Sequence, residues 1–415
     1  MKIQSKTLIY FLIALSLSAC DSWLDDAEAP KNNVGYDDMN YPDAFGEIND
    51  SGEFVPGPNV TATLYAGAQF YADLLPYSAA MSDEQEWVDG GNSLIYKDLF
   101  EDNITSSNSS IESIWAKAHN YRARSQELIT RIGQTNWNNT EEHNDVKKNA
   151  LWYGNLHAAN AYSCLVNFFN DNGSEAGNIH LEGKSVPHSE ILNLAYDAFD
   201  EALTYANEEQ KAITNTLLAR LALQHEDWAK ASKAVKSGMQ TTNEALTFTY
   251  SDGILASGIG SVAGAYGREL TVPAWFEALL TDKSRKVRYP LVKHSSDDRM
   301  AQGVYGEFDP AIVTDFAETK LIEAELAVRG HLSDTDAVSA VNEVINHFDT
   351  TGESAIEQST QLTMDDIETY RRIYLSLRAL RTLDLRRLNK DGDGPTPFGK
   401  REWKWFPVPD IETRN

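Results

Sequence analysis

Residues 217–231 read Leu217-Leu218-Ala219-Arg220-Leu221-Ala222-Leu223-Gln224-His225-Glu226-Asp227-Trp228-Ala229-Lys230-Ala231, and they give the clearest indication of the fold class. Apolar and small residues recur at spacings of three and four before residue 224 and again from residue 228, which is the pattern of helices with one buried face. A short polar segment separates the two runs. The stretch therefore predicts a helical hairpin, in which two antiparallel helices pack closely on each other.

Small residues support the hairpin and suggest that it repeats. Ala219, Ala231 and Gly238 stand twelve and seven residues apart, which matches the tetratricopeptide pattern, where small residues let paired helices touch. A looser second copy contains Ala324, Ala327 and, further on, residues 337–340. Because the match is degenerate, helical hairpins of a generic kind stay open as the alternative interpretation.

The same helical spacing continues through most of the chain. It is found in segments 146–169, 189–206, 211–224, 227–239, 311–329 and 363–389. Thr363, with Asp366 three residues later, is a capping signal for a helix N-terminus. Strand signals are few, and the best is the short run 246–250. We therefore predict a mostly all-α protein, in which tetratricopeptide-like hairpins form an α-α superhelix with long loops and few short strands.

The charge of the chain excludes one class of partner. The 415 residues include 62 acidic and 36 basic side chains, giving a formal net charge of −26. Such a surface repels phosphate backbones, so we expect no nucleic acid as a partner. Hydrophobic residues make up 42%, which is enough for a sizeable core. The two cysteines, Cys20 and Cys164, are too few for a disulfide-rich scaffold or a cysteine-based zinc site.

The first twenty residues predict export. Lys2 and Lys6 precede an uncharged apolar run from residue 8 to residue 19, which is too short to span a bilayer and has the form of a secretory signal peptide. Residues 17–20 read Leu-Ser-Ala-Cys and resemble the lipobox of bacterial lipoproteins, so we expect lipidation at Cys20 and a membrane anchor. Cys164 has apolar neighbours and is expected to be a buried, inert thiol.

These signals divide the chain into three parts. Residues 1–19 are the signal peptide, and residues 20–58 are the lipidated cysteine with a flexible tether rich in Asp, Asn, Gly and Pro. Residues 59–415 are expected to form a single helical domain.

Four features occur in the order found in the SusD/RagB family of outer-membrane nutrient-binding lipoproteins, which the sequence therefore resembles. They are the lipobox with Cys20-Asp21-Ser22-Trp23-Leu24-Asp25, the acidic segment Met81-Ser82-Asp83-Glu84, the helix pair 217–231, and the C-terminal motifs Arg381-x-x-Asp384-Leu385-Arg386-Arg387 and Phe406-Pro407-Val408-Pro409-x-x-Glu412-x-x-Asn415. The chain departs from the family pattern at 342–347 and 368–381.

The resemblance implies a function, a location and a partner. It implies a non-catalytic lipoprotein of the outer membrane, displayed on the cell surface, that binds an oligosaccharide or polysaccharide. The implied partner is a SusC-like TonB-dependent outer-membrane transporter, to which the ligand is delivered. Two alternatives stay open: a lipid-anchored helical-repeat protein that binds peptides or proteins, and a glycoside hydrolase. An acidic residue directly after the lipidated cysteine, as Asp21 is here, retains some lipoproteins in the inner membrane. The following Asp25 and Asp26 favour surface display.

The resemblance also implies where a ligand binds, by loop position. Aromatic rings stack on the apolar faces of sugars, and neighbouring polar side chains bind the hydroxyl groups. The expected glycan-binding residues lie in the loop after the acidic segment and in a later loop: Trp87, Asn92, Tyr96, Tyr266, Arg268 and Trp275. By contrast, Trp115, Trp152 and Trp228 lie on periodic helix faces and are expected in the core. Trp403 and Trp405 flank the closing motif and are expected to be structural.

The remaining motifs carry little chemistry. We expect no catalytic residues, no metal site and no cofactor, because no nucleophile elbow or histidine pair occurs at metal-binding spacing. Residues 258–264 are rich in glycine and are expected to form a flexible loop. Residues 389–394 begin like a calcium loop, but Lys400 replaces the acidic twelfth residue, so calcium stays open only as a minor alternative.

Overall fold

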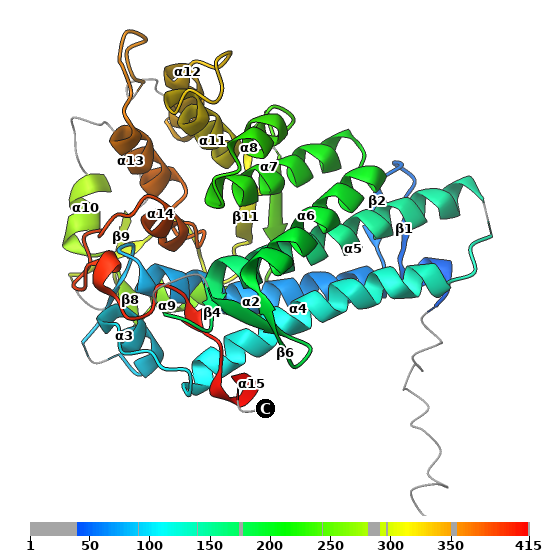
Figure 1. The fold of residues 1–415 in the computed structure, drawn as a ribbon, viewed down its shortest axis with the longest axis horizontal. Helices are drawn as coiled ribbons and strands as arrows, with labels where there is room; N and C mark the ends of the chain where they lie inside the picture. The colour runs from blue at the N-terminus through cyan, green and yellow to red at the C-terminus, as the bar shows by residue number, and fades with distance from the viewer. Residues whose placement is uncertain are drawn as a thin grey trace, which may run out of the picture.

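Helices make up most of the chain in the computed structural model, which describes residues 40–89, 91–138, 140–173, 177–242, 244–280, 291–295, 298–349 and 355–413 (Figure 1). The signal peptide, Cys20 and the first half of the expected tether lie outside the described residues. The described part of the tether is folded: 40–58 contains a short hairpin, and Phe45 is fully buried. The division into three parts stays a prediction.

The helices are α2 (Pro58–Met81), α3 (Leu94–Glu101), α4 (Ser109–Gln134), α5 (Glu141–Phe168), α6 (His188–Tyr205), α7 (Glu208–Gln224), α8 (Trp228–Val235), α9 (Gly258–Ala263), α10 (Ala274–Leu280), α11 (Phe316–Val328), α12 (Ala337–Phe348), α13 (Met364–Tyr374), α14 (Arg381–Arg387) and α15 (Asp410–Thr413), with the 3-10 turns η2 (Pro42–Ala44) and η3 (Phe398–Lys400). Consecutive helices pack as neighbours from α4 to α8 and in the pair α11 and α12, so the prediction of helical hairpins is confirmed.

The strands are short and form two-stranded pairs. They are β1 (Gly46–Ile48) with β2 (Phe54–Pro56), β3 (Glu86–Trp87) with β8 (Leu270–Thr271), β4 (Phe169–Asn170) with β12 (Phe406–Pro407), β5 (Asn178–Leu181) with β6 (Lys184–Pro187), β7 (Ala245–Phe248) with β11 (Ala311–Asp315), and β9 (Leu291–Lys293) with β10 (Met300–Gln302). The predicted strand at 246–250 is confirmed as β7. The β4 and β12 pair is parallel and fixes the closing motif against the end of α5.

Local sequence explains where the helices begin. Thr363 and Asp366 form the predicted capping box of α13, and Asn207 with Gln210 forms another at α7. Small residues explain how the hairpins pack. Ala219, Ala231 and Ala324 are completely buried where α7, α8 and α11 meet, so the backbones approach closely there.

Three sequence predictions were wrong in detail. Segment 311–329 is a strand followed by α11, because residues 311–315 pair with β7. Segment 363–389 is broken after Tyr374 by a turn in which Leu377 and Ala379 have positive φ, and it resumes as α14. Segment 258–264 is not a flexible loop but contains the short helix α9, which packs against α2.

Buried ion pairs connect the end of α2 to the C-terminal helices. Arg381 donates two hydrogen bonds to Asp83, at 2.6 and 2.8 Å, across 298 positions of sequence. Arg372 lies 3.2 Å from the same carboxylate. Next to them, Asp384 pairs with Arg371 and Arg387, and Arg387 also binds Glu325 of α11. The acidic segment and the C-terminal arginine motif are therefore the two sides of one buried network.

Asp83 and Glu84 have opposite electrostatic environments. Burial raises the pKa of the Asp83 carboxyl, but the hydrogen bonds and positive charges of Arg381 and Arg372 outweigh burial and lower this pKa to about 2. Burial raises the pKa of Glu84 to about 8. The hydrogen bond from the Leu377 amide lowers this pKa, but among the described residues no ion pair of Glu84 is found that would offset burial.

We predict that Ala231→Leu lowers the free energy of unfolding by about 1–3 kcal/mol, because the larger side chain overpacks the contact of α8 with α7 and α11. Ala229→Leu is the matched control, since Ala229 lies on the exposed side of the same helix. Urea unfolding followed by circular dichroism measures both. Equal midpoints for Ala231→Leu and wild type would show that α8 does not pack through Ala231.

We predict that Asp83→Asn costs about 3–5 kcal/mol at pH 7, because it leaves Arg381 and Arg372 buried without their carboxylate. The contribution of Asp83 to stability is fully present above about pH 4 and is lost as the pH falls towards 2, so the variant lacks that part of the pH dependence.

Glu84→Gln should have the opposite effect on the pH dependence of stability. Glu84 binds a proton on folding, so wild-type stability falls as the pH rises from about 4.5 to about 8, and the variant gains stability relative to wild type over that range.

Denaturant unfolding at a series of pH values measures these differences. The same loss of stability in both variants, at every pH, would contradict the assignment of opposite roles to the two carboxyls.

Candidate functional site

The structure brings together the two loops that the sequence analysis selected. Strand β3 pairs with β8, so that Trp87 lies opposite Leu270. The amides of Asn92 and Ser93 donate to the Glu269 carboxylate, at 3.2 and 2.9 Å. The segment after Trp87 therefore lies directly against the loop that carries Tyr266 and Arg268.

Trp87 is half-buried in this contact. The Lys97 ammonium nitrogen lies 5.2 Å from the centroid of the indole ring, so a cation already covers part of one face. The indole Nε1 is buried and has no hydrogen-bond partner within the described structure. Asn92, Arg268 and Tyr266 are exposed nearby.

Two of the six expected glycan-binding residues, Tyr96 and Trp275, make contacts that hold the fold together. Tyr96 is only 8% exposed and packs edge-to-face on Tyr77, with ring centroids 5.7 Å apart. Trp275 is half-buried in α10, and its Nε1 donates to the backbone oxygen of Asp83 at 3.0 Å. Trp275 thus ties α10 to the buried ion network, and the buried Tyr96 ring has no open face on which a sugar could stack.

Tyr266 lies on a groove of about 670 Å³, which is a volume typical of small-ligand sites. Its side chain is 83% exposed, and Phe308 on the facing loop is 40% exposed. The other lining residues are small or polar and come from α9, strands β9 and β10, and loop 303–309: Gly260, Ser261, Gly264, Ala265, Val292, Gln302, Gly303, Tyr305, Gly306, Glu307 and Asp309. We call this the Tyr266 groove.

Backbone contacts fix the shape of the Tyr266 groove. The Ser257 amide donates to the Glu307 carbonyl at 2.7 Å, which fastens the loop to the start of α9. Only glycine fits at position 260, because a Cβ there would lie 2.0 Å from the carbonyl oxygen of Gly306. The side chain of Gln302 is buried and binds the loop at three points, accepting from the Val304 and Tyr305 amides and donating to the Tyr305 carbonyl. The groove is therefore built before any ligand arrives.

The polar groups of the groove suit a ligand rich in hydroxyl groups. Glu307 and Asp309 are exposed carboxylates, although one Asp309 oxygen accepts from the Gly306 amide. Carboxylates accept hydrogen bonds from hydroxyls, and an exposed ring packs on the apolar face of a sugar. Arg268 is exposed close by in sequence but does not line the groove. Among the described residues that line the groove there are two carboxylates and no Lys or Arg.

Of the described residues that line this groove, Tyr266 alone was expected from the sequence. Phe308, Glu307, Asp309 and Gln302 lie on the side facing Tyr266, and none was among the expected residues. One signal was present: residues 303–310 alternate glycines with aromatic and acidic residues and end in proline, as an exposed loop does. Nothing in the sequence places that loop opposite Tyr266.

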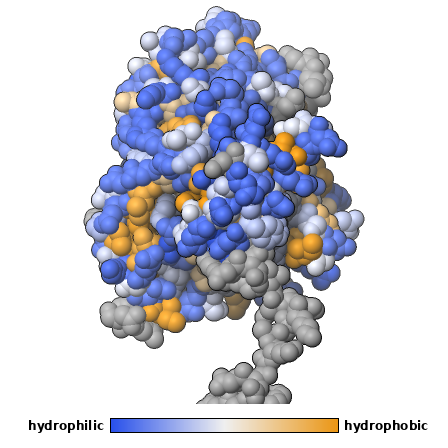
Figure 2. All heavy atoms as spheres, turned by 90° about the vertical axis from the view of Figure 1, so that its right-hand side faces the viewer, coloured by the Kyte–Doolittle hydropathy of each residue, from blue (hydrophilic) through white to orange (hydrophobic). Residues whose placement is uncertain are grey.

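A second groove, of about 650 Å³, lies at the end of the molecule that carries the β1 and β2 hairpin. Figure 2 shows that end as a mostly hydrophilic surface with separate hydrophobic patches. The aromatic rings of this groove contact one another: Phe54 lies 5.7 Å from Tyr153, and Tyr153 lies 4.7 Å from the buried Trp152. The rings therefore already pack within the protein.

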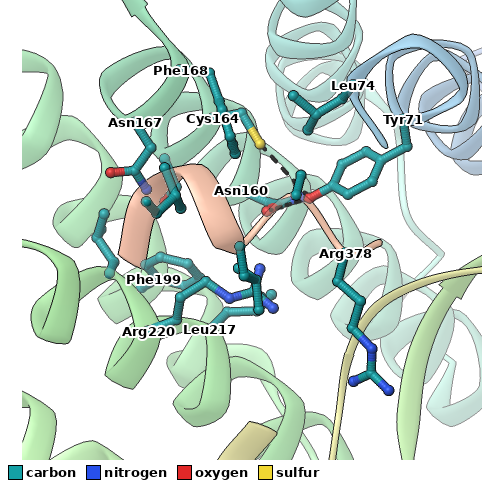
Figure 3. Close-up of a pocket in the computed structure, with 15 residues that line it drawn as sticks. Tyr71, Leu74, Asn160, Cys164, Asn167, Phe168, Phe199, Leu217, Arg220 and Arg378 are labelled. Carbon is teal, nitrogen blue, oxygen red and sulfur yellow. Dashed lines mark hydrogen bonds between the residues drawn. The ribbon is translucent and has the colours of Figure 1, made fainter. Parts of the chain in front are cut away.

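The pocket drawn in Figure 3 is an internal cavity. The Tyr71 hydroxyl there contacts Asn160 and, at 3.7 Å, the sulfur of Cys164. Arg220 lines the same cavity and is paired with Glu318. Its volume of about 20 Å³ holds about one water molecule, so it is too small for a sugar. Cys164 is buried, as predicted, and burial raises the pKa of its thiol to about 12, which disfavours the reactive thiolate.

The loop that begins like a calcium site uses its acidic side chains within the fold. Asp393 pairs with Arg372, and Asp391 accepts from the Gly399 amide. No group of three or more His, Cys, Asp or Glu side chains suitable for a metal ion occurs among the described residues.

The chain is similar in structure to proteins of the SusD superfamily. Solved structures from Bacteroides thetaiotaomicron and Bacteroides fragilis match with TM-scores of 0.68 and 0.66, at 15% and 13% identity, covering 86% of this chain and 96% and 97% of theirs. The surface glycan-binding protein A from Bacteroides uniformis matches with a TM-score of 0.62 at 15% identity, covering 86% of this chain and 96% of that one. No protein-family model and no curated protein matches the sequence. The fold is SusD-like, which confirms the resemblance first noted in the motifs.

Proposed function

We propose that this chain is a non-catalytic glycan-binding protein and that the Tyr266 groove holds the oligosaccharide. The observation that carries the proposal is the highly exposed Tyr266 ring, which lies in a preformed groove together with Phe308 and two carboxylates. The fold supports it, because one of the proteins with this fold is a surface glycan-binding protein.

Binding requires no movement of the groove in this account. Tyr266 packs on the apolar face of one sugar ring, and Phe308 contacts the same or the next ring. Glu307, Asp309 and Ser261 accept or donate hydrogen bonds to hydroxyl groups. Asn92 and Arg268 extend the polar surface towards Trp87. Because both rings stay partly exposed to water, the affinity should be moderate, which suits a protein that captures a ligand and then releases it.

The proposal includes an anchor and a destination. Lipidation at Cys20 would hold the protein at the outer membrane, on the cell surface, and a SusC-like TonB-dependent transporter would receive the glycan. The described helices include none that combines the length and hydrophobicity needed to cross a bilayer.

The same experiments also test two other functions, glycoside hydrolysis and peptide binding. A glycoside hydrolase needs an acid and a base at the sugar, and Glu307 and Asp309 both lie in the groove. A peptide-binding protein could use the same exposed rings. Product analysis separates the first alternative from simple binding, and a peptide library tests the second.

We predict that Tyr266→Ala weakens glycan binding about 5- to 150-fold, because stacking on one aromatic ring contributes about 1–3 kcal/mol. Phe308→Ala should weaken binding in the same direction. Affinity electrophoresis against a panel of polysaccharides, followed by calorimetry with the best ligand, measures both. Tyr65→Ala is the matched control, since Tyr65 is an exposed tyrosine of α2 that does not line the groove.

Equal affinity of wild type, Tyr266→Ala and Phe308→Ala for a glycan, with folding unchanged, would remove the groove from the proposal. Failure of wild type to bind any glycan in a broad panel would favour the hypothesis that the protein binds peptides. Release of shorter sugars, abolished by Glu307→Gln, would establish a hydrolase.

We predict that Cys20→Ser yields a protein that is not acylated and not associated with membranes, because the thiol is the proposed lipid acceptor. Membrane fractionation and mass spectrometry of the N-terminal peptide measure this. Retention of the variant in the membrane fraction would show that the apolar run 8–19 is itself the anchor.

A further inference from the structure

A separate pocket of about 190 Å³ lies where the end of α5, the start of α6, the end of α7 and helix α14 meet. Its lining residues are Val166, Asn167, His188, Gln224, His225, Leu383, Arg386, Arg387 and Trp405. None of them lines the Tyr266 groove. The volume leaves room for a small ion together with some water.

Arg386 is the unusual member of this pocket. Its guanidinium donates to the backbone oxygens of Lys404 and Asn167, at 2.9 and 2.6 Å, and stacks 4.2 Å from the ring centroid of Trp405. No ion pair with a carboxylate is found for it among the described residues, whereas Arg371, Arg381 and Arg387 all have one. Burial alone lowers the pKa of Arg386 to about 9. In a chain of net charge −26, this buried cation lacks a balancing anion.

Other groups in the pocket also favour negative charge. The Gln224 Nε2 is buried and has no hydrogen-bond partner within the described structure, so it is free to donate. His225 Nε2 lies 3.2 Å from the Asn167 side-chain oxygen, and His188 Nε2 lies 3.4 Å from the Phe169 carbonyl. With Nε2 as the donor, Nδ1 of each ring donates to an anion only when the ring is protonated. Arg387 completes the wall, but Asp384 and Glu325 already neutralise it.

We propose that this pocket binds a small oxyanion, the carboxylate, sulfate or phosphate group of a ligand, with Arg386 and Gln224 as donors. An oxyanion would neutralise the guanidinium and satisfy the Gln224 amide in one step. Both donors are already in place, because α14 and the closing segment hold Arg386 and the end of α7 holds Gln224. The ion is either free in solution or an acidic group on a sugar.

The two histidines make this binding dependent on pH. Burial lowers the pKa of His225 to about 4, and the nearby His188 and Arg386 contribute through repulsion. Burial also lowers the pKa of His188, with Arg386 lowering it further while the Phe169 carbonyl and Asp171 raise it. A bound anion would cancel the repulsion and favour the protonated rings. Sulfate keeps its charge from pH 7.5 to 5.5, so its affinity should rise as the pH falls over that range.

The test is calorimetric titration of the full chain with sodium sulfate, sodium phosphate and sodium glucuronate at constant ionic strength, with sodium chloride as the reference. We expect saturable binding of at least one oxyanion and an increase in thermal stability beyond that given by chloride. Binding of glucuronate but not of sulfate or phosphate would identify the ligand as an acidic sugar, and the reverse would identify a free inorganic ion.

Gln224→Glu places a carboxylate beside Arg386 and should weaken oxyanion binding at least tenfold while preserving the fold. Gln134→Glu is the matched control, since it makes the same change of charge at the exposed end of α4 and should leave binding unchanged. His225→Gln should keep binding at pH 7.5 but reduce its increase at pH 5.5. The proposal is overturned if no oxyanion binds more tightly than chloride, or if Gln224→Glu binds as wild type does.

Discussion

The carboxylate of Asp83, at the end of the first long helix, is the constraint on which the rest of the described structure depends. Arg381 binds it through two hydrogen bonds from a position 298 residues later, and Arg372 adds a second positive charge. Removing these charges from water is costly, and only the pairing offsets that cost. Once α2 and the C-terminal helices are joined in this way, Arg371, Asp384, Arg387 and Glu325 extend the contact to α11.

The Tyr266 groove and the pocket around Arg386 are connected to this network through α10, β3 and α14. Asp83 accepts hydrogen bonds from Arg381 through its carboxylate and from Trp275 through its backbone carbonyl, so α10 is held at the same point. Strand β3 leaves this corner and pairs with β8, which places the loop of Tyr266 beside that of Trp87. Helix α14 carries both Arg387 of the network and Arg386 of the pocket. Asp384 and Glu325 neutralise Arg387, whereas no ion pair of Arg386 is found among the described residues.

Sequence patterns predicted most of the helical scaffold, because apolar periodicity and small residues such as Ala219 and Ala231 report directly on helix contacts. They erred at residues 311–315 and 375–380, where pairing with β7 and positive φ at Leu377 and Ala379 override local propensity. For the candidate site, the loops were predicted but the exposure of each ring was not: Tyr96 is buried on Tyr77, whereas Tyr266 is open. Phe308 and the surroundings of Arg386 depend on contacts between distant segments, which no local pattern encodes.

Hydrogen–deuterium exchange with and without a saturating oligosaccharide tests whether the Tyr266 groove is the ligand site. We expect slower exchange on binding in residues 257–267 and 302–309, because a sugar in the groove shields both loops and restricts their opening. The second groove, with residues 149–153 and 207–213, should exchange at an unchanged rate. Protection confined to that second groove, with none around Tyr266 and Phe308, would show that the sugar binds there and not in the Tyr266 groove.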